Sequence, residues 1–387
     1  MLSAVLQSNT SNMSICSIHD ELKRAAKTAD LVQIKALAEK GVNIHIDGHV
    51  ALRLSAKRGH LHVVRYLLEQ GADIHASNDD ALRLSAENGH LEIVKYLVEN
   101  GANIHADDDY ALKYGAWNGH LDVLKFLIDQ GADIHAEDDL ALRMSARDGH
   151  LDVVEYLVAN GANIHAHGED ALQRSAEHGH ADVVKYLIAN GANIHADDDY
   201  ALQLAVQNVH LDTVKYLLVK GANVHAGNDF PLHYSAENGH LDLVKLLVQN
   251  GADIHSRNDK ALRGSTDSGY AKVVKYLVEK GADVRVVRDQ GLRTSAWNGH
   301  LEMVEYLLYE VHHGQTRDFD FKYNIVKDYP IVSHFQAERL RRQKIQLKIA
   351  QELPLHALRL HLRPTSTRIQ YMDKYFGRHF PDRRYWE

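Results

Sequence analysis

The chain has 387 residues, of which 45% are hydrophobic and 25% are charged, so it is long enough to bury a substantial core. Its single cysteine, Cys16, excludes an intramolecular disulfide, and no four Cys/His ligands stand at the spacing of a zinc site. The formal charge of −8 is divided unevenly, because residues 311–387 carry fifteen Lys/Arg and eight Asp/Glu, which leaves −15 on residues 1–310.

The first segment, residues 1–18, is rich in Ser and Asn and has neither a basic start nor a long apolar run. These features argue against a signal peptide or a transmembrane helix. We therefore expect a disordered N-terminus and an intracellular, cytoplasmic protein without membrane contact, although the sequence leaves the nucleus open.

A hexapeptide, Gly-Ala-Asp/Asn-Ile/Val-His-Ala, recurs every 30 residues from Gly71 to Gly221, ends in Ser after Gly251 and decays at Gly281. A fixed period of this length predicts a solenoid, in which one small helical unit is stacked many times. The repeat thus determines most of the fold.

The first helix of one unit has Leu82 and Ala86 on a single face. We expect Asp79 to cap this helix and Gly89 to end it in a left-handed conformation. The second helix carries an apolar stripe at i, i+3, i+6 and i+7, formed by Leu91, Val94, Leu97 and Val98.

Two motifs, Gly-His-Leu-Glu/Asp-x-Val-Lys-Tyr-Leu and Gly-Ala-Asp/Asn-Ile, recur through residues 20–310, and in them the chain resembles the ankyrin repeat family. That family's Thr-Pro-Leu-His survives only as Phe230-Pro231-Leu232-His233, and a period about three residues shorter than the family's implies shorter hairpin fingers. The 30-residue variant ending in Ile-His-Ala resembles ankyrin families of giant DNA viruses of amoebae (mimivirus-type).

This resemblance implies an all-α ankyrin-repeat solenoid of about ten helix-turn-helix units, spanning residues 19–310, with an N-terminal cap repeat at residues 19–50. It also implies a monomeric, non-catalytic scaffold for protein–protein interaction. For a viral protein it implies action in the host cytoplasm or packaging in the virion. The second helices should begin near Leu31, Leu61, Leu91, Leu121, Leu151, Ala181, Leu211, Leu241, Ala271 and Leu301.

Acidic residues gather where ankyrin proteins bind partners, in the hairpin tips, and Asp108, Asp138 and Asp198 are examples. One hypothesis is a basic protein partner. The alternative is that one Asp per repeat caps the first helix while the others keep an exposed edge soluble.

Positions that differ between repeats are better contact candidates than those that recur, because a scaffold position must repeat. Aromatic residues, Met and Arg are enriched at binding hot spots. The partner-binding candidates of this kind are Tyr110, Tyr114, Trp117, Met144, Arg174, Tyr200, Phe230 and Tyr234. Packing between repeats is the alternative role for these side chains.

Two histidine ladders raise the question of a metal site, one from His45 to His255 in the hairpins and one from His60 to His300 in the turns between helices. Equivalent residues of stacked repeats lie about 8–10 Å apart, whereas two ligands of one zinc each lie about 2 Å from it. We therefore expect structural roles, no metal and no cofactor, and a loosening of the array near pH 6 if the rings are neutral when folded.

No phosphate-binding loop, nucleophile elbow or kinase signature occurs, so we expect no enzyme activity. Val209 stands where other repeats have glycine, and a β-branched residue would be strained in a left-handed turn. This predicts a weak joint.

The period ends after Leu308, and residues 311–387 are predicted to form a basic helical tail with a helix from Ser333 to about Glu352. The tail is either a cap for the array or a module that recruits a second factor. It faintly resembles the ubiquitin-ligase-recruiting modules of poxvirus ankyrin proteins at Leu353-Pro354-Leu355, and its basic helix leaves nucleic-acid binding as a further alternative.

Overall fold

The computed structural model describes residues 18–300, 302–304 and 306–307, so the predictions for residues 1–17 and for the tail lie outside this part. Every regular element in the described part is helical, and residues 18–27 are helical too. The first helices of the repeats are α3 (Ile46–Lys57), α5 (Ala76–Glu87), α7 (Ala106–Trp117), α9 (Ala136–Asp148), α11 (Ala166–Glu177), α13 (Ala196–Gln207), α15 (Ala226–Glu237), α17 (Ser256–Asp267) and α19 (Arg288–Asn298).

The second helices are nine residues long and begin at predicted positions. They are α2 (Leu31–Glu39), α4 (Leu61–Glu69), α6 (Leu91–Glu99), α8 (Leu121–Asp129), α10 (Leu151–Ala159), α12 (Ala181–Ala189), α14 (Leu211–Val219), α16 (Leu241–Gln249) and α18 (Ala271–Glu279). A short 3-10 helix, η1 (Val284–Val286), precedes α19.

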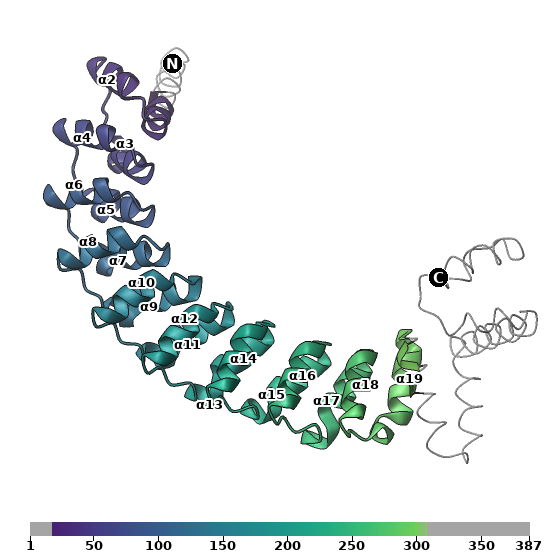
Figure 1. Ribbon diagram of the computed structural model, residues 1–387. Helices are drawn as coiled ribbons and strands as arrows, with labels where there is room; N and C mark the ends of the chain where they lie inside the picture. Colours follow the sequence, from purple (N-terminus) through teal and green to yellow (C-terminus); the bar gives the residue numbers. More distant parts are fainter. Residues whose placement is uncertain (1–17, 301, 305, 308–387) are drawn as a thin grey trace, which may run out of the picture. The chain divides into compact units, whose positions relative to one another are not determined.

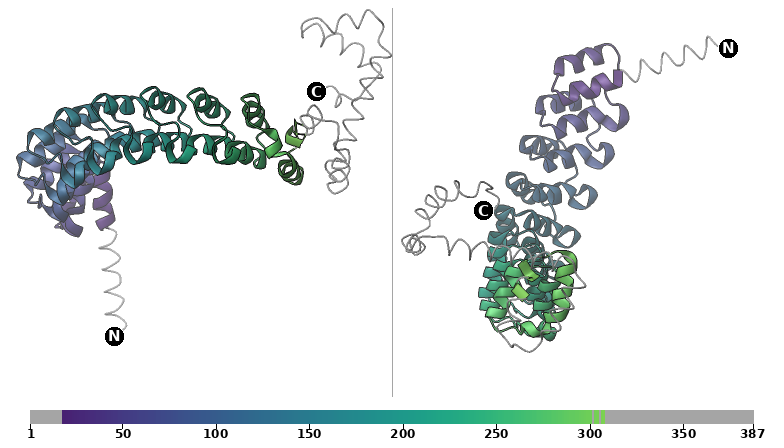
Figure 2. Two further views of the ribbon diagram at one scale, coloured as in Figure 1. Left: turned by 90° about the horizontal axis from the view of Figure 1, so that it is seen from below. Right: turned by 90° about the vertical axis from the view of Figure 1, so that its right-hand side faces the viewer.

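Contacts divide the chain into two compact units, Met1–Gly264 with Glu279–Ala282, and Ser265–Val278 with Asp283–Glu387. In the first unit, each first helix from α3 to α13 packs against the next repeat's first helix and its own second helix, as α7 does against α9 and α8 (Figures 1 and 2). In the second unit, η1 packs against α19. The predicted all-α solenoid of stacked helix pairs is confirmed.

The core lies between the two helices of each pair and between successive pairs. In the first helix, Leu82 and Ala86 are buried as predicted. In α6, however, Ile93 is buried with Val94 and Leu97, while Leu91 and Val98 are only half-buried. The buried stripe is therefore turned slightly from its predicted position, because it must face both the partner helix and the neighbouring repeat.

The second to fourth residues within the bounds of each first helix from α5 to α17 are left-handed, such as Asp107, Asp108 and Asp109 in α7, with φ of 58°, 52° and 57°, so the regular helix starts after this turn. A left-handed residue normally costs about 1–2 kcal/mol, and Gly, Asn and Asp tolerate it best. This accounts for the Asp, Asn and Gly residues in the hairpins.

Candidate protein-binding surface

The third residue of the left-handed turn places its carboxylate inside the stack. Asp109 is 5% exposed, and its carboxylate accepts hydrogen bonds from His105 Nδ1 (3.1 Å) and from the backbone N–H of Asp133 in the next repeat (2.9 Å). Asp79 does the same with His75 (3.1 Å) and Asn103 (2.8 Å). The predicted capping role of Asp79 is therefore wrong, because its carboxylate joins two repeats instead.

The first histidine ladder is the donor half of this joint. The same His–carboxylate pair recurs in the hairpins of α9 to α17, with Asp139, Glu169, Asp199, Asp229 and Asp259 as acceptors. Glu169 differs from the others, because its Oε2 atom is buried without a hydrogen-bond partner. The prediction of a structural role is confirmed for this ladder.

The second ladder also joins neighbouring repeats. His90 Nε2 donates to the Lys57 carbonyl (3.0 Å), and His120 Nε2 donates to the Glu87 carbonyl (3.1 Å). A Cβ atom on Gly89 would lie 2.6 Å from the ring of His120. Glycine is therefore required in this turn both for its positive φ and for the space that the next histidine occupies.

A row of long polar side chains, which the sequence analysis did not single out, donates hydrogen bonds to the backbone carbonyls of the hairpins. Arg83 donates to the carbonyls of Asn78 and Ser77 (both 3.0 Å) and to Asp107 Oδ2 of the next hairpin (2.9 Å). Hydrogen bonds to hairpin carbonyls recur at Lys113, Arg143, Gln173, Gln203 and Arg263. The signal was a long basic or amide side chain every 30 residues from Arg53 to Arg263, with His233 in its place in one repeat.

The acidic tips are therefore only partly available to a partner. The acidic residue at the third position of the turn is buried in the hairpins of α5 to α17, except for the half-buried Asp229. The first position is paired in three hairpins, through Asp107 to Arg83, Glu137 to Lys113 and Asp197 to Gln173. The middle residues Asp108 and Asp138 are exposed and have no side-chain hydrogen bond or ion pair. Asp198 is exposed as well and accepts the Gly227 N–H (2.8 Å).

Three predicted contact residues on α7 form one aromatic cluster. The rings of Tyr110 and Tyr114 stack with centroids 3.9 Å apart, and Trp117 lies 5.2 Å from Tyr114. The Arg83 guanidinium lies over the Tyr110 ring (4.9 Å to the centroid) and that of Arg147 over the Trp117 ring (5.7 Å).

Polar atoms of this cluster are also bonded within the stack. Tyr110 Oη donates to Glu87 (3.0 Å), and Trp117 Nε1 donates to Asp148 (2.8 Å). Burial and the bond to Glu87 raise the pKa of the Tyr110 phenol, which keeps it neutral. The cluster thus packs between repeats, as the alternative expected, while its rings remain partly exposed.

A second aromatic cluster lies on α15, where Phe230 and Tyr234 have ring centroids 5.2 Å apart. Tyr200 occupies the position of Phe230 one repeat earlier, on α13, and is 42% exposed. All three lie in the same row of the stacked first helices as the α7 cluster.

A family model for ankyrin repeats (three copies) matches residues 22–108, 76–138, 112–198 and 196–258, which together cover more than half of the chain. The protein belongs to the ankyrin repeat family. No match was found among the curated proteins. Ankyrin repeats indicate a protein–protein interaction scaffold and are generally non-catalytic.

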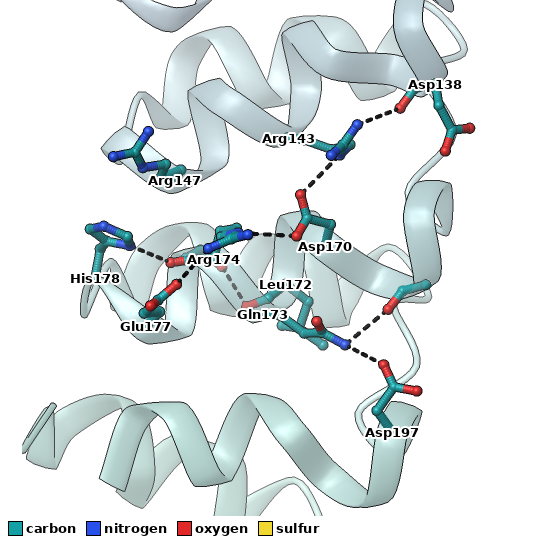
Figure 3. A network of polar contacts seen from close by, with 12 residues as sticks. Asp138, Arg143, Arg147, Asp170, Leu172, Gln173, Arg174, Glu177, His178 and Asp197 are labelled. Atoms are coloured by element: carbon teal, nitrogen blue, oxygen red, sulfur yellow. Dashed lines mark hydrogen bonds and ion pairs between the residues drawn. The ribbon is translucent and has the colours of Figure 1, made fainter. Parts of the chain in front are cut away.

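Arg174, on the same ankyrin surface, is held in a polar network that crosses three repeats (Figure 3). Its guanidinium contacts Asp170 and Glu177 (both 3.1 Å), and Asp170 also pairs with Arg143 of the preceding repeat (2.9 Å). Burial acts to lower the pKa of Arg174, but the two carboxylates raise it overall. Met144, one repeat earlier, is half-buried.

Two further properties concern the described part of the ankyrin array. No three His, Cys, Asp or Glu side chains in residues 18–307, gaps excepted, are grouped as a metal site requires. None of the described helices has the length and apolar character needed to cross a membrane.

Proposed function

We propose that the ankyrin repeats bind a protein partner through the hairpin tips and the exposed row of the first helices. The observation that carries this proposal is the contrast between two kinds of position. The His–carboxylate pairs and turn glycines, which join repeats, recur along the array. In the exposed row, by contrast, Tyr114, Met144, Arg174 and Tyr234 occupy one equivalent position and are at least partly exposed.

The charge of the free tips favours a basic partner. Asp108 and Asp138 stand at equivalent positions of adjacent repeats, about 8–10 Å apart by the spacing of packed helices. Because neither carboxylate is paired within the chain, a partner cation would not have to displace an internal one. The charge of −15 on residues 1–310 would also accelerate encounter with a basic protein at low salt.

The test uses the full chain with a purification tag and cell extract, followed by mass spectrometry of the proteins retained. A variant with Asp108→Lys, Asp138→Lys and Met144→Arg should lose the retained partner, because it reverses the tip charge and places a charge in the exposed row. A matched control with Asp182→Lys and Asp242→Lys reverses two exposed charges on second helices and should retain it. Equal retention by both variants would contradict the proposed surface.

A second role is proposed for residues 311–387, on the basis of their net charge of +7. The tail either recruits ubiquitin-ligase machinery, as an adaptor of viral type would, or contacts nucleic acid. Removing the tail from the tagged chain separates these roles: loss of ligase subunits supports the adaptor, and loss of salt-sensitive nucleic-acid retention supports the other. If removing the tail changes neither the ligase subunits nor the nucleic acid retained, the tail has no recruiting role.

A further inference from the structure

The two aromatic clusters occupy equivalent positions but differ in what surrounds them. On α7, Tyr110, Tyr114 and Trp117 lie at i, i+4 and i+7, and the same positions on α15 hold Phe230, Tyr234 and Glu237. The chain itself thus provides an internal comparison between two surfaces on one scaffold.

In the α7 cluster, arginine side chains of the two neighbouring repeats lie over the aromatic rings. Arg83, from the preceding repeat, lies over Tyr110 and also reaches Asp107, and Arg147, from the following repeat, lies over Trp117. These contacts show that this row accepts a guanidinium over an aromatic ring with a carboxylate close by.

The α15 cluster lacks these cations. Gln203 stands where Arg83 stands and also donates to its hairpin carbonyl, that of Asp198 (2.8 Å), but it carries no charge. Gly227 replaces Asp107, the carboxylate that pairs with Arg83. In the described part of the chain no Lys or Arg lies over the rings of Phe230, Tyr234 or Tyr200.

Two exposed carboxylates nevertheless lie near the aromatic rings of α13 and α15. Glu237 is exposed two turns along α15 from Phe230, and three residues after Tyr234, so it shares their helix face. Asp198 is exposed at the tip beside Gly227, whose N–H it accepts. The surface therefore combines partly exposed rings with carboxylates and has no cation of its own over the rings.

We propose that Tyr200, Phe230 and Tyr234, named here the open aromatic surface, bind arginine side chains of an extended basic segment in the partner protein. The guanidinium stacks on the rings as Arg83 stacks on Tyr110, and its charge faces Glu237 and Asp198. A planar guanidinium fits this arrangement better than the compact ammonium of lysine. This inference rests on the proposed function and names the chemistry of the partner.

Equivalent positions of adjacent repeats lie about 8–10 Å apart, and an extended segment in the polyproline II conformation spans about 9 Å in three residues while keeping side chains i and i+3 on one side. One segment with Arg at positions i and i+3 can therefore place one guanidinium near Tyr200 and another near Phe230 and Tyr234. A suitable probe is a fluorescein-labelled 12-residue Gly/Ser peptide with two arginines at this spacing. Its two controls carry lysine, or the neutral isostere citrulline, at both positions.

Fluorescence anisotropy with the full chain measures binding of each peptide. The arginine peptide should bind at least about tenfold more tightly than the citrulline peptide, and more tightly than the lysine peptide. A variant with Tyr200→Leu and Tyr234→Leu should weaken the arginine peptide by about tenfold or more, since the apolar volume is kept but the ring faces are lost. Tyr186→Leu, on second helix α12, should not change binding, and thermal melting verifies that each variant is folded.

Equal binding of the arginine and citrulline peptides would overturn the proposal, as would full binding by the Tyr200/Tyr234 variant. If salt abolishes binding of the arginine peptide but the Tyr200/Tyr234 variant binds it fully, the binding would be due to the carboxylates alone, and the role of the rings would be wrong. These outcomes leave the proposed function standing if the extract experiment still retains a partner through Asp108, Asp138 and Met144. If the Asp108/Asp138/Met144 variant retained the partner as well as its control does, both the proposed function and this inference would be contradicted.

Discussion

Val209 is the residue at which sequence and backbone geometry conflict most clearly. It adopts φ +63° in the turn where other repeats have glycine, as predicted, and its side chain is 42% exposed. A β-branched side chain is costly in this conformation, so relief of the strain should be measurable. Val209→Gly should therefore raise the free energy of unfolding by about 1 kcal/mol in urea titration.

The control is the opposite change in an equivalent turn. Gly89→Val should destabilise by more than Val209→Gly stabilises, because a Cβ atom on Gly89 also meets the His120 ring. An unchanged or lowered stability in Val209→Gly would show that the turn carries no strain.

His233 supplies a prediction about pH. Its ring is 4% exposed, its Nε2 atom has no hydrogen-bond partner, and burial lowers its pKa, helped by the nearby cations Lys260 and Arg257 and opposed by Asp229. The unfolded chain therefore binds a proton near pH 6.5 that the folded chain binds only at lower pH. Stability contributed by neutral His233 is present above pH 6.5 and falls as the pH drops from there to the folded pKa.

Substituting His233→Gln should remove this loss while keeping stability at pH 8. Gln173 and Gln203 occupy the same position in other repeats and donate to their hairpin carbonyls, so glutamine fits this row. Melting temperatures at pH 8 and pH 5.5 give the measurement. The variant should lose less stability on acidification, by at most about 1.4 kcal/mol for each pH unit. If the wild type and His233→Gln lost the same stability between pH 8 and pH 5.5, His233 would not be the group responsible for the loss.

At the scale of one hairpin, Asp108 and Asp109 form a matched pair. Both are left-handed, so replacing either with alanine carries the same backbone penalty. Only Asp109 has buried hydrogen bonds, to His105 and to the Asp133 N–H. Asp109→Ala should therefore destabilise by about 1–3 kcal/mol more than Asp108→Ala in urea titration, since it leaves buried donors unpaired. Equal effects would mean that the His–carboxylate joint contributes nothing.

The hairpin also marks the limit of what the sequence could predict. The second helices were placed to the residue because the preceding Gly-His turn has a strong local signature. Asp79 was misread as a cap because Asp is favoured both at helix N-termini and in left-handed turns, and only the position of Asn103 in the next repeat distinguishes the two. Contacts between repeats, such as that of Arg83 with Tyr110, depend on register across 24 to 27 residues and leave no local pattern.

For the molecule as a whole, the expected loosening near pH 6 depends on the histidines whose pKa is lowered by folding. In the second ladder, burial lowers the pKa of His180, so protonation there is disfavoured in the folded state. The expected loosening near pH 6 therefore applies to rings whose pKa is lowered in the folded state, such as half-buried His180 and buried His233.

The stacking of pairs predicts how a local defect spreads. Since each repeat contacts mainly its neighbours, a cavity in one pair should weaken that pair and the adjacent ones and leave distant pairs protected. Leu124 in α8 and Leu247 in α16 are both fully buried within the first unit, and either one replaced by alanine should cost about 2–5 kcal/mol locally. Hydrogen exchange measured peptide by peptide then reports which helices open.

Leu124→Ala should accelerate exchange in α7 to α10 and leave α15 and α16 unchanged, and Leu247→Ala should give the reverse pattern. In Leu247→Ala, the strained turn at Val209 should let the accelerated exchange spread into α13 and α14, because the stability of that pair is already reduced there. Adding Val209→Gly to Leu247→Ala should then restrict the accelerated exchange further toward α15 and α16. Uniform acceleration in both leucine variants would instead show that the first unit unfolds as a single cooperative block, and that its repeats are coupled over more than their nearest neighbours.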